Sequence, residues 1–459
     1  MATHVQTVSG VDSDLRELAT TVVSRAMKAG ATAAESVVRE GSEFSTVVRM
    51  GEVETLKESG SRAIGLRVFL GQSAASTYSS DFTEDGIRRL VSGAMDLAKV
   101  TSADAYSGIP EADQLGSLGD LQLYYDDVYS LPPEERIDYA RRAEKAALET
   151  DARLKNSDGG SFDAATGHKV LANSHGFVGE YRRSYCSVSV APIAQDDNGN
   201  MQRDYWFSLA RTLSKLESAE SVGREAARRT LRRLGSRKIA STQVPIVLDP
   251  MVAGSILDNV FDAVNGDAVY RQSSFLANML GEKVAADNIT VVDDGTIPGG
   301  FGTEPFDGEG IPTRRTVVIE NGILKSYLLN TYTAKKLGLK TTGNASRGLA
   351  GTPGIGAGNF FLQKGDKTPQ QIIAGIKQGL YVFQFLGFGV NLVTGDFSRG
   401  ASGVWIENGE LTYPVEEITV AGNLKDMLYN ISEIGNDLQF RGSLASPTLR
   451  IDGMMIAGE

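Results

Sequence analysis

The feature that most constrains the fold of this chain is a change of sequence pattern near Gly235, about halfway along its 459 residues. Before that point, apolar residues at helical spacing alternate with β-branched runs of period two. After it, glycines become frequent, and the pairs Asn321-Gly322 and Asn408-Gly409 stand between apolar runs, which is the strongest short signal for a β-hairpin. Because a chain of this length exceeds one typical core, we predict an α+β protein of two domains. A mixed α/β N-terminal domain covers residues 1–235, a β-rich C-terminal domain covers residues 244–459, and a polar linker lies at about 236–243.

Helices and strands can be placed in both predicted domains. The predicted N-terminal helices are 15–30, one that begins near Thr83 as its N-cap, one from the Pro132-Pro133 pair to about 149, and a basic helix at 218–234. The predicted N-terminal strands are 35–40, 44–50, 52–58, 63–70 and several segments between 152 and 213. In the C-terminal domain we predict strands at 244–248, 316–320, 324–330, 403–407 and 448–452, with one helix at 369–378 among them.

The basic helix ends in a run of arginines that allows two interpretations. Its members are Arg224, Arg228, Arg229, Arg232 and Arg233. Such a run can bind a phosphate or an acidic partner. Because Glu220 and Glu225 lie on the same helix and the whole chain is acidic, we predict a solvated helix face instead.

Charge and composition exclude several classes of protein. The net charge is -11, so the chain would repel nucleic acid and anionic membranes, and neither is expected as a partner. The single cysteine, Cys186, permits no intrachain disulfide. Residues 1–10 are polar and lack the apolar stretch of a secretory signal. No run approaches the about 18 apolar residues of a transmembrane helix. We therefore expect a soluble cytoplasmic protein.

The usual catalytic side chains are scarce. The histidines are His4, His168 and His175, and their spacing does not predict a zinc site. His175 lies in a turn-like stretch, which indicates a structural hydrogen bond. Cys186 lies in an alternating strand and is interpreted as a small core residue. No Gly-x-Ser-x-Gly elbow is present, and Ser398 and Ser402 have no histidine near them in sequence.

Two further clusters have a structural and a functional interpretation. Gly354, Gly356 and Gly358 lack the spacing of a nucleotide-binding loop, so backbone geometry or a peptide-binding edge explains them better. Asp258 and Asp262 lie four residues apart on a predicted helix, and Asp267 follows. These carboxylates could bind a hard cation such as magnesium or calcium, but exposed helical acids are the preferred interpretation.

Several long segments together resemble one family, the TldD/PmbA peptidases. The most specific segment is VTGDFSRGASGVWIENGE at 393–410, which continues through PVEEITVAGNL at 414–424 to IGND at 434–437. PFDGEGIP at 305–312 and TGNASR at 342–347 match as well, and VRMGEVE at 48–54 and GLRVF at 65–69 fit the family's opening domain. The resemblance covers roughly residues 15–457 and implies the α/β plus β-rich architecture described above.

The resemblance also implies a biochemical setting. In this family, TldD-type and TldE-type chains pair into a zinc peptidase that acts on unfolded peptides. The TldD-type chain carries His-Glu-x-x-x-His on a helix and a cysteine near its C-terminus. Here the equivalent helix is 253–264, where Asp258 and Ala263 take the places of the histidines and Asn259 that of the glutamate, and no cysteine lies at 433–437. The resemblance therefore implies a TldE (PmbA)-type chain with no catalytic residue, cofactor or metal ligand of its own, the zinc being held by the partner.

The favoured hypothesis is a non-catalytic subunit that shapes the substrate chamber of a TldD/TldE metallopeptidase. Its expected partners are a TldD-type subunit and a peptide, which exposed strand edges could hold by β-augmentation; the isolated chain could form a homodimer. Two alternatives remain open. One is an autonomous hydrolase that uses Asp258 and Asp262 with a hard cation, and the other is a stand-alone peptide-binding homo-oligomer.

Overall fold

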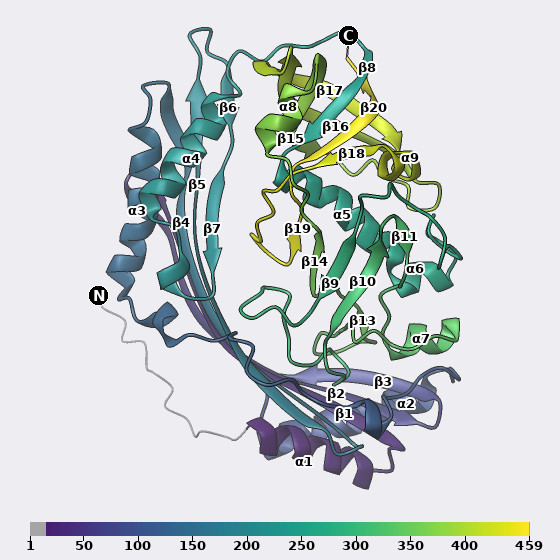
Figure 1. Ribbon diagram of the computed structural model, residues 1–459. Coiled ribbons are helices and arrows are strands. Elements are labelled where there is room, and N and C mark those ends of the chain that lie inside the picture. The colour runs from purple at the N-terminus through teal and green to yellow at the C-terminus, as the bar shows by residue number, and fades with distance from the viewer. Residues whose placement is uncertain (1–14, 459) are drawn as a thin grey trace.

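The computed structural model describes residues 15–458, so His4 lies outside the described residues. In the first half of the chain, antiparallel strands pair in the order β3-β2-β1-β4-β5-β6, and β7 also pairs with β5. These strands are β1 (Ala33–Arg49), β2 (Glu52–Leu70), β3 (Ser73–Ser79), β4 (Leu154–Asn173), β5 (Val178–Gln195), β6 (Met201–Arg203) and β7 (Trp206–Ala210). Figure 1 shows this sheet as a long curved surface that wraps around the second half of the chain.

Two strand breaks that we predicted are absent. The predicted strands 35–40 and 44–50 form the single strand β1, and 52–58 and 63–70 form the single strand β2. β1 pairs along nearly its whole length with β2 on one edge and β4 on the other. Gly41 lies at the predicted break, where a Cβ would stand 2.7 Å from the carbonyl oxygen of Thr166. The prediction was wrong because pairing on both edges overrides a local gap in the apolar pattern.

Two pairs of helices cover this sheet, one pair toward each end (Figure 1). α1 (Leu15–Lys28) and α2 (Glu84–Val100) share a core with the ends of β1 and β2. α3 (Pro133–Leu148) and α4 (Ala219–Leu231) share another with β4 and β5. The predicted N-cap of α2 is confirmed, because Thr83 Oγ1 accepts a hydrogen bond from the backbone N–H of Gly86 at 3.1 Å.

The second half of the chain contains a small barrel. Its strands are β8 (Thr242–Leu248), β15 (Gln378–Leu386), β16 (Asp396–Glu407), β17 (Glu410–Asn423) and β20 (Leu449–Ala457), with β18 (Ile431–Ile434) paired to β20. β17 pairs with both β16 and β20, which closes the ring. The predicted turn at Asn408-Gly409 joins β16 to β17, and both residues have positive φ, 52° and 84°. Such a turn matches the right-handed twist of the strands that it joins.

A second sheet and most of the helices pack beside the barrel around one continuous core, whereas Ile372 and Ile376 form a separate cluster with Val247 and Ile406. The sheet runs β11 (Ile323–Leu324), β10 (Arg315–Glu320), β9 (Val291–Asp294), β14 (Asn359–Leu362) and β19 (Leu444–Ala445), and a separate pair is β12 (Ala345–Ser346) with β13 (Gly354–Ile355). The helices are α5 (Pro250–Val264), α6 (Gly266–Tyr270), α7 (Thr331–Leu337), α8 (Pro369–Ala374) and α9 (Leu424–Tyr429). Within residues 15–458 no helix has the length and apolar character needed to cross a membrane.

The second half contains more helix than we predicted, and one predicted strand is wrong. Of the segment 324–330, only Leu324 lies in a strand. Asn330 instead caps α7, because its side chain accepts a hydrogen bond from the backbone N–H of Thr333 at 2.8 Å. The α+β class is confirmed. The division into two domains stays a prediction; in the described residues, strands before 211 and strands after 241 belong to separate sheets.

The basic run of α4 is not a solvated face. Arg229 is 5% exposed, and its guanidinium lies between the carboxylates of Asp204 (3.9 Å) and Asp249 (3.7 Å) and 4.8 Å from the centre of the Trp206 ring. Arg232 and Arg233 also face Asp204, and both cover the Phe383 ring of the barrel. Only Arg224 and Arg228 are exposed. The prediction was wrong because α4 packs against the second half of the chain, a contact that no local pattern reveals.

We expect Arg229→Met to lower the free energy of unfolding by on the order of 3 kcal/mol, because the buried carboxylate of Asp249 loses its paired cation and Asp204 keeps only Arg232 and Arg233. Methionine retains most of the side-chain volume. Urea unfolding followed by circular dichroism measures the change. The exposed Arg224→Met on the same helix is the control and should change stability by less than about 0.5 kcal/mol; equal effects of the two substitutions would contradict the prediction.

The loop between β9 and β10 is held by buried carboxylates. Asp307 accepts hydrogen bonds from the backbone N–H groups of Glu309 (2.8 Å), Ile311 (3.0 Å) and Ala345 (3.0 Å). Glu309 accepts one from Thr331, the first residue of α7, at 2.9 Å. Burial raises the pKa of Asp307 to about 6, and burial together with the charge of Asp307 raises the pKa of Glu309 to about 7.

Because folding raises the pKa of both carboxyls, these two groups bind more protons in the folded chain than in the unfolded chain across about pH 3.8 to 7, Asp307 in the lower part of that window and Glu309 in the upper part. Their contribution to stability is present below that window and is lost as the pH rises through it. A pKa that differs by one pH unit between the two states corresponds to about 1.4 kcal/mol. We therefore expect the Tm of the wild type to fall between pH 5 and pH 8, and Glu309→Gln to lose part of that fall. The exposed Glu410→Gln should retain the wild-type pH dependence; a pH dependence unaltered by Glu309→Gln would refute the assignment.

Candidate functional site

Helix α5 carries the candidate site and begins in a well-defined way. Asp249 caps it, because its side chain accepts a hydrogen bond from the backbone N–H of Met251 at 3.1 Å, and Pro250 occupies the first turn. The apolar face of α5, which includes Ile256 and Val260, is buried in the core of the second half. The polar face is therefore held in a fixed direction, toward the first half of the chain.

A cleft of about 680 Å³, which we call the α5 cleft, lies along that polar face. Its walls come from β7, α4, the first part of α5 and the segment 437–446. Its lining includes Trp206, Arg228, Ser255, Asp258, Asp437 and Arg441. The α5 cleft is thus built from both halves of the chain, and a concave site between two parts of a fold is where peptides and small ligands commonly bind.

The structure separates the positions that the resemblance aligns with the metal motif. Asp258 is exposed and lines the α5 cleft. Asn259 is half-buried, and its amide nitrogen donates a hydrogen bond to the backbone oxygen of Ser255 at 2.7 Å. Ala263 is fully buried in the core. Of these positions, only Asp258 lines the α5 cleft.

The segment where the resemblance places a cysteine does reach the same cleft. Asp437 lines it, and both carboxylate oxygens are engaged by Thr448, Oδ1 by the backbone N–H (3.0 Å) and Oδ2 by the hydroxyl (2.8 Å). Glu433, four residues earlier, pairs with Lys367 at 2.5 Å. The structure therefore brings α5 and the end of the 433–437 segment to the same cleft. Where the resemblance places a metal-binding cysteine, this chain has carboxylates that are bonded to other residues of the protein.

The other predicted carboxylates do not join Asp258 in a cluster of three. Asp262 lies one turn further along α5, and burial, with a smaller contribution from the charge of Asp258, raises its pKa. Asp267 instead pairs with Arg271 at 2.9 Å. Burial also lowers the pKa of Arg399, which reaches Ser255 of the same helix, and the carboxylate of Asp258 opposes that lowering. A cation bound at Asp258 and Asp262 would thus compete with a neighbouring guanidinium.

These residues do not fit a zinc ion. Zinc needs three or four convergent nitrogen, sulfur or carboxylate ligands. Across residues 15–458, no group of three or more His, Cys, Asp or Glu side chains is arranged to hold a metal ion. Alanine at 263 has no donor atom, and an asparagine at 259 cannot act as a carboxylate base.

The remaining residues singled out in the sequence have structural roles. His175 makes the predicted structural hydrogen bond, Nδ1 to the backbone oxygen of Pro110 at 2.8 Å. His168 lies 3.1 Å from Glu180. Cys186 is fully buried, and burial raises the pKa of its thiol to about 12, as expected for an unreactive core residue.

Sequence reasoning missed the residues that join the two walls of the α5 cleft. Arg441 stacks on the ring of Trp206 at 4.3 Å and pairs with Glu217 at 3.2 Å, although 224 residues separate the pair. Asp249 receives a hydrogen bond from the hydroxyl of Tyr381 at 2.8 Å as well as the charge of Arg229. A lone arginine that stacks on a tryptophan from the other half of the chain carries no local signal.

Comparison with known proteins shows similarity over almost the whole chain. Residues 34–98, 126–234 and 241–458 match domain 1, the central domain and the C-terminal domain of the PmbA/TldA metallopeptidases. The chain is 38% identical over 463 residues to Metalloprotease PmbA of Escherichia coli O157:H7, covering 100% of each, and 35% identical to the Metalloprotease PmbA homolog of Haemophilus influenzae, covering 97% of each.

Solved structures share the fold. A crystal structure from Bacteroides thetaiotaomicron superposes with a TM-score of 0.91 at 28% identity, covering 98% of this chain and 100% of that chain. TldE from Thermococcus kodakarensis superposes with a TM-score of 0.87 at 21% identity, covering 96% and 100%. The second likeness concerns the fold alone.

The different surroundings of Asp258 and Ala263 lead to a test of this geometry. We expect Ala263→His to lower the free energy of unfolding by about 1–3 kcal/mol, because an imidazole must enter a filled core. Asp258→His should change it by less than about 0.5 kcal/mol, because that side chain is exposed. Urea unfolding followed by circular dichroism measures both; a well-tolerated histidine at 263 would show that this position is open to the cleft.

Proposed function

Because the chain belongs to the PmbA/TldD metallopeptidase family, we propose that it is the non-catalytic, TldE (PmbA)-type subunit of a zinc peptidase complex that acts on unfolded peptides. A TldD-type partner carries the metal and the general base. This chain supplies part of the chamber in which the peptide is held.

The observation that carries the proposal is the chemistry at the aligned positions of α5. Asp258 faces the α5 cleft, the Asn259 amide is bonded to the helix backbone, and Ala263 lies in the core. The helix thus retains its place beside the cleft, while the side chains that bind zinc and activate water are replaced by ones that do neither.

The lining of the α5 cleft supports a peptide rather than a small rigid ligand. Its volume of about 680 Å³ is lined by both halves of the chain. Trp206 offers an apolar surface, and Arg228 and Asp258 offer charges of opposite sign. A lining of mixed character suits the backbone and varied side chains of an unfolded peptide.

An autonomous hydrolase that uses Asp258 and Asp262 has less support. Two carboxylates on one helix would leave most of the oxygen ligands of a magnesium or calcium ion to water, and no third acidic, histidine or cysteine side chain of residues 15–458 is arranged to complete a metal site with them. The segment 433–437 brings Asp437 to the cleft already bonded to Thr448.

We expect the purified chain alone to bind no stoichiometric zinc and to cleave no peptide, and a TldD-type chain mixed with it to cleave unstructured peptides in a zinc-dependent way. Metal analysis of each separated subunit and mass spectrometry of a synthetic peptide mixture give the two readouts. The matched control is a complex whose TldD-type chain lacks its motif histidines. Zinc-dependent cleavage by the present chain alone, persisting after repurification, would overturn the proposal.

A variant of this chain tests whether the α5 cleft belongs to the chamber. Ser255→Trp fills the cleft from its α5 wall and should lower cleavage by the assembled complex without preventing assembly, as measured by peptide hydrolysis and co-elution of the two chains. Ser92→Trp, at an exposed position of α2, should leave cleavage unchanged. Full cleavage by the assembled Ser255→Trp complex would remove the α5 cleft from the chamber.

A further inference from the structure

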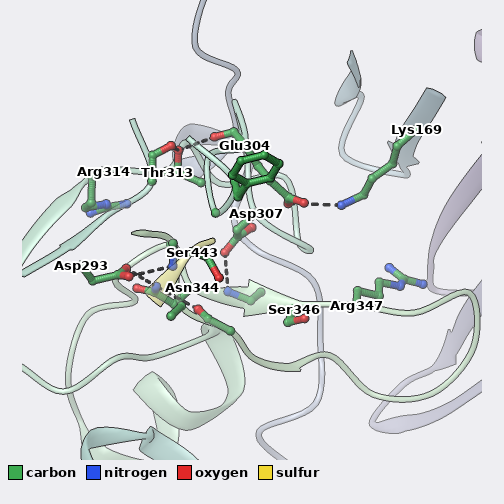
Figure 2. Close-up of a pocket in the computed structure, with 18 of the residues that line it drawn as sticks. Lys169, Asp293, Glu304, Asp307, Thr313, Arg314, Asn344, Ser346, Arg347 and Ser443 are labelled. Carbon is green, nitrogen blue, oxygen red and sulfur yellow. Dashed lines mark hydrogen bonds and ion pairs between the residues drawn. The ribbon is translucent and has the colours of Figure 1, made fainter. Parts of the chain in front are cut away.

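A second cavity, which we call the loop cavity, lies where the long sheet meets the loops of the second half, and it encloses about 350 Å³. β1, β4 and β5 contribute Arg39, Lys169 and Arg183 to its lining, and the loops around 293–314 and 343–358 contribute most of the rest. Figure 2 shows Lys169 reaching to Glu304 from one side and Arg314 on the opposite side.

The carboxylates of the loop cavity are already engaged. Asp293 accepts hydrogen bonds from the Asn344 amide and the Gly358 backbone N–H, both at 2.7 Å. Asp307 accepts from backbone N–H groups through both oxygens. Glu304 lies 3.5 Å from the ammonium of Lys169. Of the acidic side chains that line the cavity, only Glu304 pairs with one of its lining cations.

The positively charged side chains that line the loop cavity outnumber the one carboxylate, Glu304, that pairs with any of them. Within residues 15–458, the side chains of Arg183 and Arg314 make no hydrogen bond or ion pair. Arg39 donates one hydrogen bond, to the backbone oxygen of Arg347, and its buried Nε has no partner. Arg347 itself does not add to this surplus, because its guanidinium extends away from the loop carboxylates (Figure 2) and pairs with Glu35 of β1 at 2.7 Å. The loop cavity therefore holds guanidinium donors with no acceptor.

The glycines that line the loop cavity do not form a phosphate loop. The backbone N–H of Gly356 is bonded to Asn344, that of Gly358 to Asp293 and that of Gly302 to the side chain of Asn359. Glycine is required there for close approach: a Cβ at 302 would lie 2.0 Å from the backbone oxygen of Gly358. Because these N–H groups already have acceptors, an anion would have to be bound by the arginines and the lysine, and planar guanidinium groups pair well with carboxylates.

The position of the loop cavity links it to the α5 cleft and to the inner face of the sheet. Ser443 lines the loop cavity, while the next residues, 444–446, line the α5 cleft. A trough of about 300 Å³ along β1, β4 and β5 shares Arg39, Lys169, Arg183 and Glu304 with the loop cavity. A chain that lies in the trough can thus place its end in the loop cavity, one short strand away from the cleft.

We propose that the loop cavity binds the free α-carboxylate of a peptide through Arg183 and Arg314, so that this subunit recognises its substrate by the C-terminal end. The identification of the ligand as a peptide rests on the proposed function. The binding of a carboxylate does not, because it requires neither zinc nor a partner.

The test is calorimetric titration of the isolated chain with tetra-alanine, with tetra-alanine amide and with inorganic phosphate. We expect the free acid to bind at least about tenfold more tightly than the amide, as one lost charge-assisted pairing implies. The double variant Arg183→Gln/Arg314→Gln should reduce binding of the acid by at least about tenfold and leave the amide unaffected. Arg182→Gln/Arg315→Gln, which removes the arginine adjacent to each of these, is the matched control and should bind as the wild type does.

Equal binding of acid and amide, tighter binding of phosphate than of the acid, or unchanged binding by the double variant would each overturn the inference. All of these residues are exposed, and circular dichroism verifies that both double variants fold. The proposed function fails separately from this inference. If the complex cleaves peptides but the chain does not distinguish acid from amide, the proposed function stands and this inference fails. If the chain binds the carboxylate but no complex cleaves peptides, this inference stands and the proposed function fails.

Discussion

The buried guanidinium of Arg229 is the interaction on which the arrangement of the molecule depends most. It stands on the last turns of α4, against Trp206 of the long sheet, and lies between Asp204 of the first half and Asp249 of the second. Asp249 is also the N-cap of α5. One cation therefore neutralises a carboxylate in each half and holds the start of the helix that forms one wall of the α5 cleft. A buried charge set of this kind is costly to break, because each partner left alone remains out of water.

The α5 cleft and the loop cavity both depend on that arrangement. Each is lined by residues from the long sheet or its helices and by residues from the second half, and the segment 443–446 lies between them. Neither half could form these surfaces alone. In the proposed function, the α5 cleft between the halves holds a peptide, and the residues that cut it belong to the partner; in the further inference, the loop cavity binds the peptide's C-terminal end.

Local sequence signals predicted the features that depend on a few neighbouring residues. The N-cap at Thr83 and the turn at Asn408-Gly409 follow from hydrogen bonds and backbone geometry within four residues. The same reasoning failed at Gly41, where strand pairing on both edges carries β1 through a polar stretch, and at 324–330, where Asn330 caps a helix instead. The burial of Arg229, Arg232 and Arg233 could not be predicted, because Phe383 lies more than a hundred positions further along the chain and the pairing of Arg229 with Asp249 depends on how α4 packs against the second half.

By itself, the sequence determined the α+β class through the spacing of its apolar residues and turn signals, and it determined the family and the residue types at the positions of the metal motif through its resemblance to known chains. Asp258, Asn259 and Ala263 lack the set of atoms that a zinc site requires, whatever surrounds them. Only the tertiary structure decided that Asp258 faces a cleft while Ala263 lies in the core. It also decided that Arg183 and Arg314, more than a hundred residues apart, line one cavity with no acceptor for their donors. Whether a charged side chain has a partner depends on its neighbours in three dimensions, and the order of residues along the chain does not specify those neighbours.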